Sequence, residues 1–238
     1  MCFSKEASYV TGAVLIALGG YTILTNKQKK LLPAACIPLF FGLQQLAEGN
    51  IWSSFETGVP IPLASFEDLT DTKTLSTALY LMFAFFIWPI WIPLSALLPE
   101  KIAFRRTLLK TTLAIGIITT VISILTLKGN QITIKPYDHS IQYFLSKPFF
   151  LPLEPFLLFY GLAVIAPTFI ASTRGFLIFG YTVIATVLIS YYFYFNTFTS
   201  VWCFFSAWLS ILIAMIIQAG NQEADEQKYA KESHIDKL

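Results

Sequence analysis

Long apolar stretches alternate with short polar connections along almost the whole chain. None of the stretches shows the two-residue alternation over about ten residues that a membrane barrel strand requires. Each is long enough to cross about 30 Å of hydrocarbon as a helix that rises about 1.5 Å per residue. The pattern predicts seven transmembrane helices, at residues 7–25, 33–52, 75–97, 108–127, 150–172, 175–195 and 201–220.

The predicted fold class is all-α, a polytopic bundle of seven helices. Helix is expected because a chain in lipid must satisfy its backbone donors and acceptors within each segment. Pro89 and Pro93 interrupt the third stretch, remove backbone donors and should kink it, which can shape a cavity, although membrane helices generally tolerate proline. We expect one transmembrane domain at residues 1–220, followed by a polar tail at 221–238.

Composition supports a membrane protein and excludes several other classes. Apolar residues make up 55% of the 238 positions and charged residues only 13%, too little polar surface for a water-soluble globule. The apolar composition makes membrane lipid the expected partner. The net charge is only +2, so we expect no nucleic acid among the partners. The chain also lacks a glycine-rich phosphate loop and a lysine in the middle of its last stretch, which argues against nucleotide binding and a retinal-type pigment.

Basic residues predict the orientation in the membrane. They gather at residues 27–30, at 101–110 and at Arg174, in every second connection between the stretches. Because positively charged connections usually stay in the cytoplasm, the N-terminus is expected outside and the tail inside.

One polar face interrupts the second stretch. Gln44, Gln45 and Glu48 are spaced three and four residues apart, so they share one side of a helix. An ionisable group inside a bilayer is costly, and this face should therefore point into the bundle. If the second helix ends near Trp52, Glu48 lies roughly 6 Å below the outer edge of the membrane. Glu154, near the outer end of the fifth helix, lies at a similar depth.

The predicted topology gathers further reactive side chains in this outer layer. Cysteine, histidine and carboxylate are zinc donors, and three of them with an open position would hold an activated water. The candidate metal ligands are Cys2, Glu48, His139 and Cys203, with zinc as the expected ion. In this interpretation Glu48 and His139 are also the catalytic groups. The substrate pocket would be lined by Gln44, Gln45, Trp52 and Glu154.

Three other interpretations of the same residues stay open. Cys2 and Cys203 could form a disulfide outside the cytoplasm. A cysteine could act as a nucleophile with His139 as its base. In the plainest interpretation, Glu48 and the glutamines only bond neighbouring helices, and His139 is a solvated loop residue.

Several motifs resemble a known group of proteins. The opening Met-Cys-Phe-Ser at residues 1–4, the stretch at 37–49, the tryptophan-proline pair at 88–89 and the Val-Trp-Cys-Phe-Phe run at 201–205 look like an uncharacterised family of bacterial seven-helix membrane proteins. The resemblance implies a bacterial inner membrane location. It also implies Cys2, Glu48, His139 and Cys203 as polar marks, whereas Glu154 is not part of the family pattern.

The helix number is also similar to that of the membrane hydrolases that include alkaline ceramidases and adiponectin-receptor-like proteins. Those enzymes hold zinc with several histidines. This chain has only His139 and His234, which the predicted topology separates by the membrane, so their metal site does not transfer residue by residue.

These observations predict an integral membrane protein with a polar pocket near the outer leaflet. A metal-dependent hydrolase acting on a lipid-like substrate is one function that suits the pocket. The alternative is a non-enzymatic binder, carrier or sensor of a small molecule or lipid, so whether the protein is an enzyme stays open.

Overall fold

The computed structural model describes residues 4–56, 61–63, 72–128, 130, 132–137, 139–146 and 150–235. Within these residues, seven helical segments are long and apolar enough to cross a membrane, which confirms the predicted number. The segments are Lys5–Thr25, Lys29–Phe55, Thr74–Leu97, Ala103–Leu127, Leu153–Ile170, Phe176–Phe193 and Phe195–Ala230.

Three of the segments are single helices, namely α1 (Lys5–Thr25), α6 (Ala103–Leu127) and α9 (Phe176–Phe193). The second segment consists of η1 (Lys29–Leu31), α2 (Leu32–Ala35) and α3 (Ile37–Glu56). The third consists of α4 (Thr72–Met82), the π-helix η2 (Phe83–Ile87) and α5 (Trp88–Leu97). The fifth consists of α7 (Leu153–Val164) and α8 (Ala166–Ile170), and the last of η3 (Phe195–Thr197) and α10 (Phe198–Ile235).

Prolines explain where the broken segments divide. Pro33, Pro38, Pro89 and Pro167 each lie in the first turn of a helix that follows a break. A proline has no N–H to donate to the preceding turn, but it fits the first turn of a new helix, where that donor has no partner.

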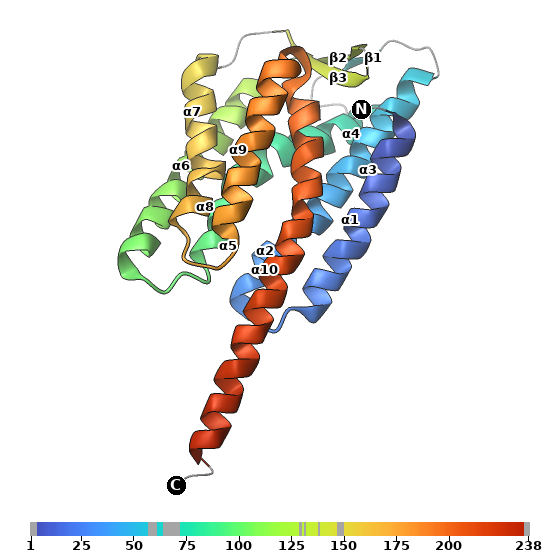
Figure 1. Ribbon diagram of the computed structural model, residues 1–238. Helices are drawn as coiled ribbons and strands as arrows, with labels where there is room; N and C mark the ends of the chain where they lie inside the picture. Colours follow the sequence, from blue (N-terminus) through green and yellow to red (C-terminus); the bar gives the residue numbers. More distant parts are fainter. Residues whose placement is uncertain are drawn as a thin grey trace.

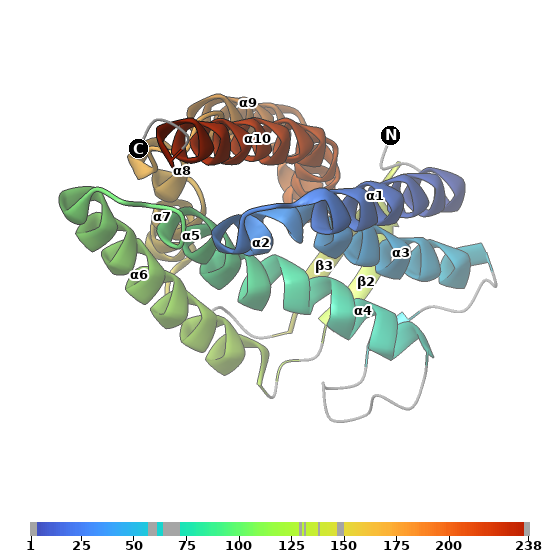
Figure 2. The same ribbon diagram turned by 90° about the horizontal axis from the view of Figure 1, so that it is seen from below.

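The helices run side by side, with a small sheet at one end of the bundle and the last part of α10 projecting from the other (Figure 1). We call these the sheet end and the tail end. α1 packs along α3, α5 packs along α6, and α10 lies against both α9 and α3 (Figures 1 and 2). The last helix therefore joins the N-terminal pair to the rest of the bundle.

Three strands form an antiparallel sheet in the order β1 (Ile61–Leu63), β2 (Ile132–Tyr137) and β3 (Ser140–Leu145). The all-helical prediction is therefore incomplete, because two connections between spans contain strands. In β2, Ile132 and Ile134 are buried, which is the alternation of a strand with one covered face. Tyr137 pairs with Ser140, so His139 lies in the connection between β2 and β3.

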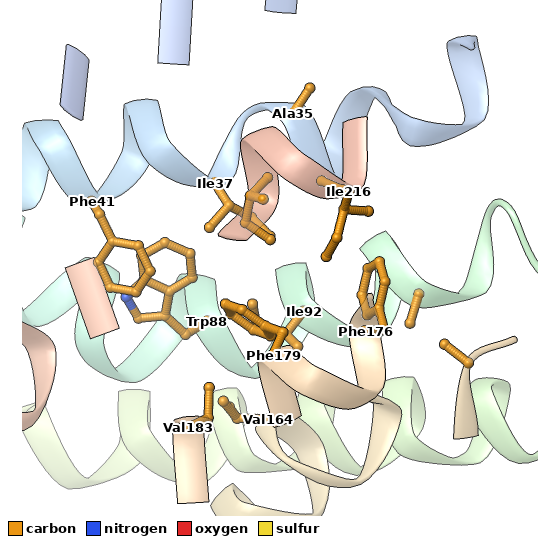
Figure 3. Close-up of a cluster of buried hydrophobic side chains, with 14 of the residues drawn as sticks. Ala35, Ile37, Phe41, Trp88, Ile92, Val164, Phe176, Phe179, Val183 and Ile216 are labelled. Atoms are coloured by element: carbon orange, nitrogen blue, oxygen red, sulfur yellow. The ribbon is translucent and has the colours of Figure 1, made fainter. Parts of the chain in front are cut away.

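The largest hydrophobic core joins helices from both halves of the chain (Figure 3). Phe41 of α3 stacks on Trp88 of α5 with ring centroids 3.9 Å apart. Phe176 and Phe179 of α9 extend the same core towards Ile216 of α10 (Figure 3). Burial of these side chains fixes how α10 lies between α3 and α9.

α10 continues as a helix to Ile235, through most of the polar region predicted as a tail at 221–238. Asp225 pairs with Lys27 at 2.7 Å, and Asn221 accepts a hydrogen bond of 2.8 Å from the backbone N–H of Lys27. The first turns of the tail are therefore tied to the connection between α1 and η1.

Gly116 gives a test of the packing between α5 and α6. A methyl group added at Gly116 would overlap the backbone carbonyl of Pro89, whereas one added at Gly20 of α1 would meet nothing within 4 Å. We predict that Gly116→Ala lowers the free energy of unfolding by about 1 to 3 kcal/mol, because the backbone cannot move aside freely. Gly20→Ala should leave it unchanged or raise it by up to about 1 kcal/mol.

Thermal unfolding of the detergent-solubilised variants measures both effects. Equal melting temperatures for Gly116→Ala and Gly20→Ala would contradict the close approach of these two helices.

Candidate functional site

Glu48 of α3 is completely buried and accepts two hydrogen bonds. The hydroxyl of Ser200 on α10 donates to its Oε1 at 2.6 Å, and the amide of Gln45 donates to its Oε2 at 3.2 Å. Gln44, Gln45 and Glu48 all have an exposed fraction of 0%. The expectation that this polar face points into the bundle is confirmed. Gln45 and Ser200 are neutral, so no cationic side chain among the described residues is hydrogen-bonded to the Glu48 carboxyl group.

Gln44 connects three spans. Its Nε2 donates to the Cys203 thiol on α10 at 3.3 Å, and its Oε1 accepts from the indole N–H of Trp88 on α5 at 3.0 Å. An amide that donates and accepts in this way holds three helices in one register. Sequence spacing predicted the glutamine face, but the role of Trp88 depends on how α5 packs.

Tyr80 of α4 extends this cluster towards the sheet. Its hydroxyl donates to the backbone carbonyl of Thr199 at 3.2 Å and also interacts with the Cys203 thiol. Its ring stacks on Tyr143 of β3 with centroids 5.2 Å apart and planes only 8° apart. The start of α10 is thus linked to both the third span and the sheet.

A cavity of about 340 Å³ lies beside this cluster. Its wall is contributed by the third span, α6, α7, the end of α9, η3, the start of α10 and the strands β2 and β3. Most of the lining side chains are apolar, including Leu81, Ala84, Phe85, Leu127, Ile132, Ile141, Leu145, Leu153, Phe156 and Leu157. Thr199 and Cys203 belong to both the cluster and the cavity wall, whereas Glu48 does not line the cavity.

The π-helix η2 forms part of this wall. The N–H of Trp88 donates to the carbonyl of Phe83, five residues earlier. The next carbonyl in that pattern, that of Ala84, would pair with Pro89, which has no N–H. The hydroxyl of Tyr160 on α7 donates to the Ala84 carbonyl at 2.6 Å instead. Tyr160 therefore supplies the missing donor at a point where the chain borders the cavity.

The remaining predicted site residues lie elsewhere. His139 is exposed in the turn between β2 and β3, and Glu154 is exposed in the first turn of α7. Trp52 is partly buried on α3, where its ring meets that of Phe55 edge-on at 5.8 Å. Cys2 lies outside the described residues.

Metal ligation by Cys2, Glu48, His139 and Cys203 stays a prediction. Across the part of the chain that the structure describes, no three side chains of histidine, cysteine, aspartate or glutamate gather closely enough to hold an ion. Because Cys2 is outside that part, the complete ligand set is not tested. Cys203 is a free thiol in the structure, so the disulfide interpretation gains no support.

Glu100, a buried carboxylate at the tail end that no sequence motif predicted, is 1% exposed. It accepts hydrogen bonds from the backbone N–H groups of Lys101 and Ile102, both at 2.9 Å, and of Ser172 at 2.8 Å. The Ser172 hydroxyl also donates to it, at 2.7 Å. Burial alone would raise the pKa of this carboxyl, but these bonds lower the pKa below its ordinary value. Glu100 thus ties together the connections that precede α6 and α9.

Seven long apolar helices, a buried polar cluster and an apolar cavity are features of a multi-pass membrane protein with an internal site. Residues 1–229 match the model of a family of unknown function (DUF6629), and the chain belongs to that family. The expectation of an uncharacterised family is confirmed. No curated protein and no solved structure matches the chain significantly.

Substitution of Glu48 tests whether the cluster needs a neutral hydrogen-bonding group or a negative charge. The carbonyl oxygen of Gln45 has no hydrogen-bond partner among the described residues. In Glu48→Gln, a rotated Gln45 amide would accept from the new amide, and Ser200 would keep its acceptor. We predict an unchanged or higher melting temperature.

In the variant Glu48→Leu, the free energy of unfolding should instead fall by about 1 to 3 kcal/mol, because buried donors are left unsatisfied. Thermal unfolding in detergent compares the two variants. If Glu48→Gln is as unstable as Glu48→Leu, the cluster depends on the negative charge of Glu48, and a neutral hydrogen-bonding group is not sufficient.

Proposed function

We propose that this protein is a multi-pass membrane protein that binds a lipid-like molecule in the cavity beside Cys203. The single observation that carries the proposal is an apolar cavity of about 340 Å³ whose wall includes side chains on the outside of the bundle. Binding, carrying or sensing of the ligand is the function that these features support best.

The distribution of charge supports an outward-facing cavity. Lys29, Lys101 and Arg174 lie in connections at the tail end, whereas β2 and β3 lie at the sheet end and contribute to the cavity wall (Figure 1). By the rule that basic connections stay inside, the tail end faces the cytoplasm and the cavity lies near the outer leaflet. A bacterial inner membrane, implied by the resemblance described above, is the proposed location.

The cavity wall is continuous with the lipid-facing surface. Leu153 and Leu157 of α7 line the cavity and are 43% and 42% exposed. Tyr191 of α9 and Phe195 of η3 also line it, and they are 56% and 60% exposed. Such large apolar side chains on the outside of a membrane bundle face hydrocarbon. A ligand can therefore reach the cavity sideways from the bilayer.

The volume and chemistry of the cavity indicate the class of ligand. About 340 Å³ lies near the lower limit of ligand pockets, which run from about 300 to 1,000 Å³, and it suits one acyl chain better than two. Gln142 of β3 and Asn196 of η3 supply amide groups to the wall near the sheet. These groups suit the polar head of a single-chain amphiphile whose tail lies among the apolar side chains.

A metal-dependent hydrolase acting on such a ligand is the second candidate. The observation that favours it is the proximity of Glu48 and Cys203, two of the four predicted ligands, in one buried cluster beside the cavity. This version predicts one bound zinc ion per chain, lost in Glu48→Gln and in His139→Ala. Elemental analysis of the purified protein tests it, and absence of a stoichiometric ion would overturn the metal-dependent version alone.

Two neighbouring leucines of α7 allow a matched test of lipid binding. Leu157 lines the cavity, whereas Leu158 does not and is 62% exposed. We predict that Leu157→Trp weakens binding of dodecanoic acid at least about tenfold, because steric overlap in a packed site costs more than about 1.4 kcal/mol. Leu158→Trp should bind as the unmodified protein does.

Native mass spectrometry of the detergent-solubilised protein counts the bound fatty acid over a concentration series. A single saturable adduct that only Leu157→Trp removes supports the proposal. Equal binding by both variants would mean that the fatty acid binds outside the cavity.

A further inference from the structure

A second cavity, of about 180 Å³, lies at the tail end of the bundle. Its wall comes from the connections before η1, before α6 and before α9, and from α10 around Gly220. The polar side chains that line it include Gln28, Lys101, Ser172, Thr173, Arg174 and Glu223. Each of them lies close to the end of one of the apolar stretches of the sequence, the region where lipid headgroups meet a membrane protein.

Two cations in this wall have no partner in the part of the chain that the structure describes. Within the described residues, the ammonium of Lys101 and the guanidinium of Arg174 form no hydrogen bond or ion pair. Other basic side chains at this end already have partners: Lys27 pairs with Asp225, and Arg105 and Arg106 donate to backbone carbonyls. Lys101 and Arg174 therefore remain available to an anion, and a guanidinium can bind a phosphate through two parallel hydrogen bonds.

The buried carboxylate Glu100 joins the two connections that carry these cations. It accepts from the backbone of Lys101 at 2.9 Å and from that of Ser172, two residues before Arg174, at 2.8 Å. Four donors, three backbone N–H groups and the Ser172 hydroxyl, bind the Glu100 carboxylate and hold both connections in place before any ligand binds. A site arranged in advance loses less entropy when it binds its ligand.

Glu223 adds a negative group to the same wall. Its side chain is exposed and forms no hydrogen bond or ion pair within the described residues. Two cations and one carboxylate complement a phosphodiester that also carries an ammonium group, because its phosphate has one negative charge and its ammonium has one positive charge. An ammonium group on the ligand would satisfy Glu223, whereas a phosphate alone would be repelled by it.

We propose that this cavity binds a phosphate ester that carries an amine, with the phosphate on Lys101 and Arg174 and the amine on Glu223. Phosphatidylethanolamine of the leaflet at the tail end has this chemistry, and so does a water-soluble phosphoethanolamine ester. The site is separate from the apolar cavity, and it does not depend on the function proposed above.

Lipid binding by the purified, delipidated full chain tests this site. Native mass spectrometry compares phosphatidylethanolamine with phosphatidylcholine of the same acyl chains, since the choline group has no N–H donor. The unmodified protein should bind phosphatidylethanolamine more tightly. Lys101→Gln and Arg174→Gln should each weaken it about fivefold, the effect of about 1 kcal/mol per basic residue near a membrane surface.

Three further variants separate a binding role from a structural one. Lys101→Arg keeps the charge and should retain binding. Glu223→Gln should remove the preference for ethanolamine over choline without abolishing binding. Lys128→Gln removes one positive charge at the opposite end of α6 and should change nothing. Melting temperatures confirm that each variant is folded.

Competition with glycerophosphoethanolamine identifies the source of the ligand. Displacement of the lipid by this soluble ester supports a site for the phosphate ester itself, and resistance to displacement supports a lipid site that also needs the acyl chains. The proposal is overturned if folded Lys101→Gln and Arg174→Gln bind phosphatidylethanolamine as well as Lys128→Gln does, or if the unmodified protein does not distinguish the two lipids.

Discussion

The hydrogen bond from the hydroxyl of Tyr160 to the carbonyl of Ala84 gives a partner to a backbone group that the third span leaves unpaired. In apolar surroundings every backbone polar group needs a partner within the protein. The third span breaks its own pattern at η2, because Pro89 cannot donate to the turn before it. Tyr160 supplies the replacement donor at 2.6 Å, and Thr120 of α6 also donates to the carbonyl of Phe86 at 3.1 Å. The hydrogen bonds at η2 thereby join the third span to α6 and α7. These three elements all contribute to the wall of the apolar cavity.

The start of α10 connects this cavity to the buried polar cluster. Ser200 binds Glu48 on one side, while Cys203 accepts from Gln44 and also lines the cavity. A ligand that presses on the cavity wall would therefore act on a helix whose position is set by buried hydrogen bonds to α3. Because α10 continues to the tail end, both proposed sites lie along a single helix (Figure 1).

The sequence predicted the features that depend on local patterns, and it missed those that depend on distant contacts. Hydropathy gave the seven spans, and helical spacing gave the buried face of Gln44, Gln45 and Glu48. The sheet was missed because its strands are short and occur in connections that were read as loops. Glu100 was missed because its partner Ser172 is 72 residues away and neither belongs to a motif. The placement of His139 in an exposed turn likewise follows from the register of β2 and β3, which no local pattern specified.

The central claim is that an apolar chain from the bilayer occupies the cavity beside Cys203. Photolabelling with a diazirine-bearing fatty acid in proteoliposomes, followed by mass spectrometry of the labelled peptides, tests it most directly. Cavity residues such as Phe156 and Trp202 should carry the label, and these labels should disappear when excess dodecanoic acid is present. Labels confined to side chains outside the cavity, such as Leu158 and Ile178, would contradict it.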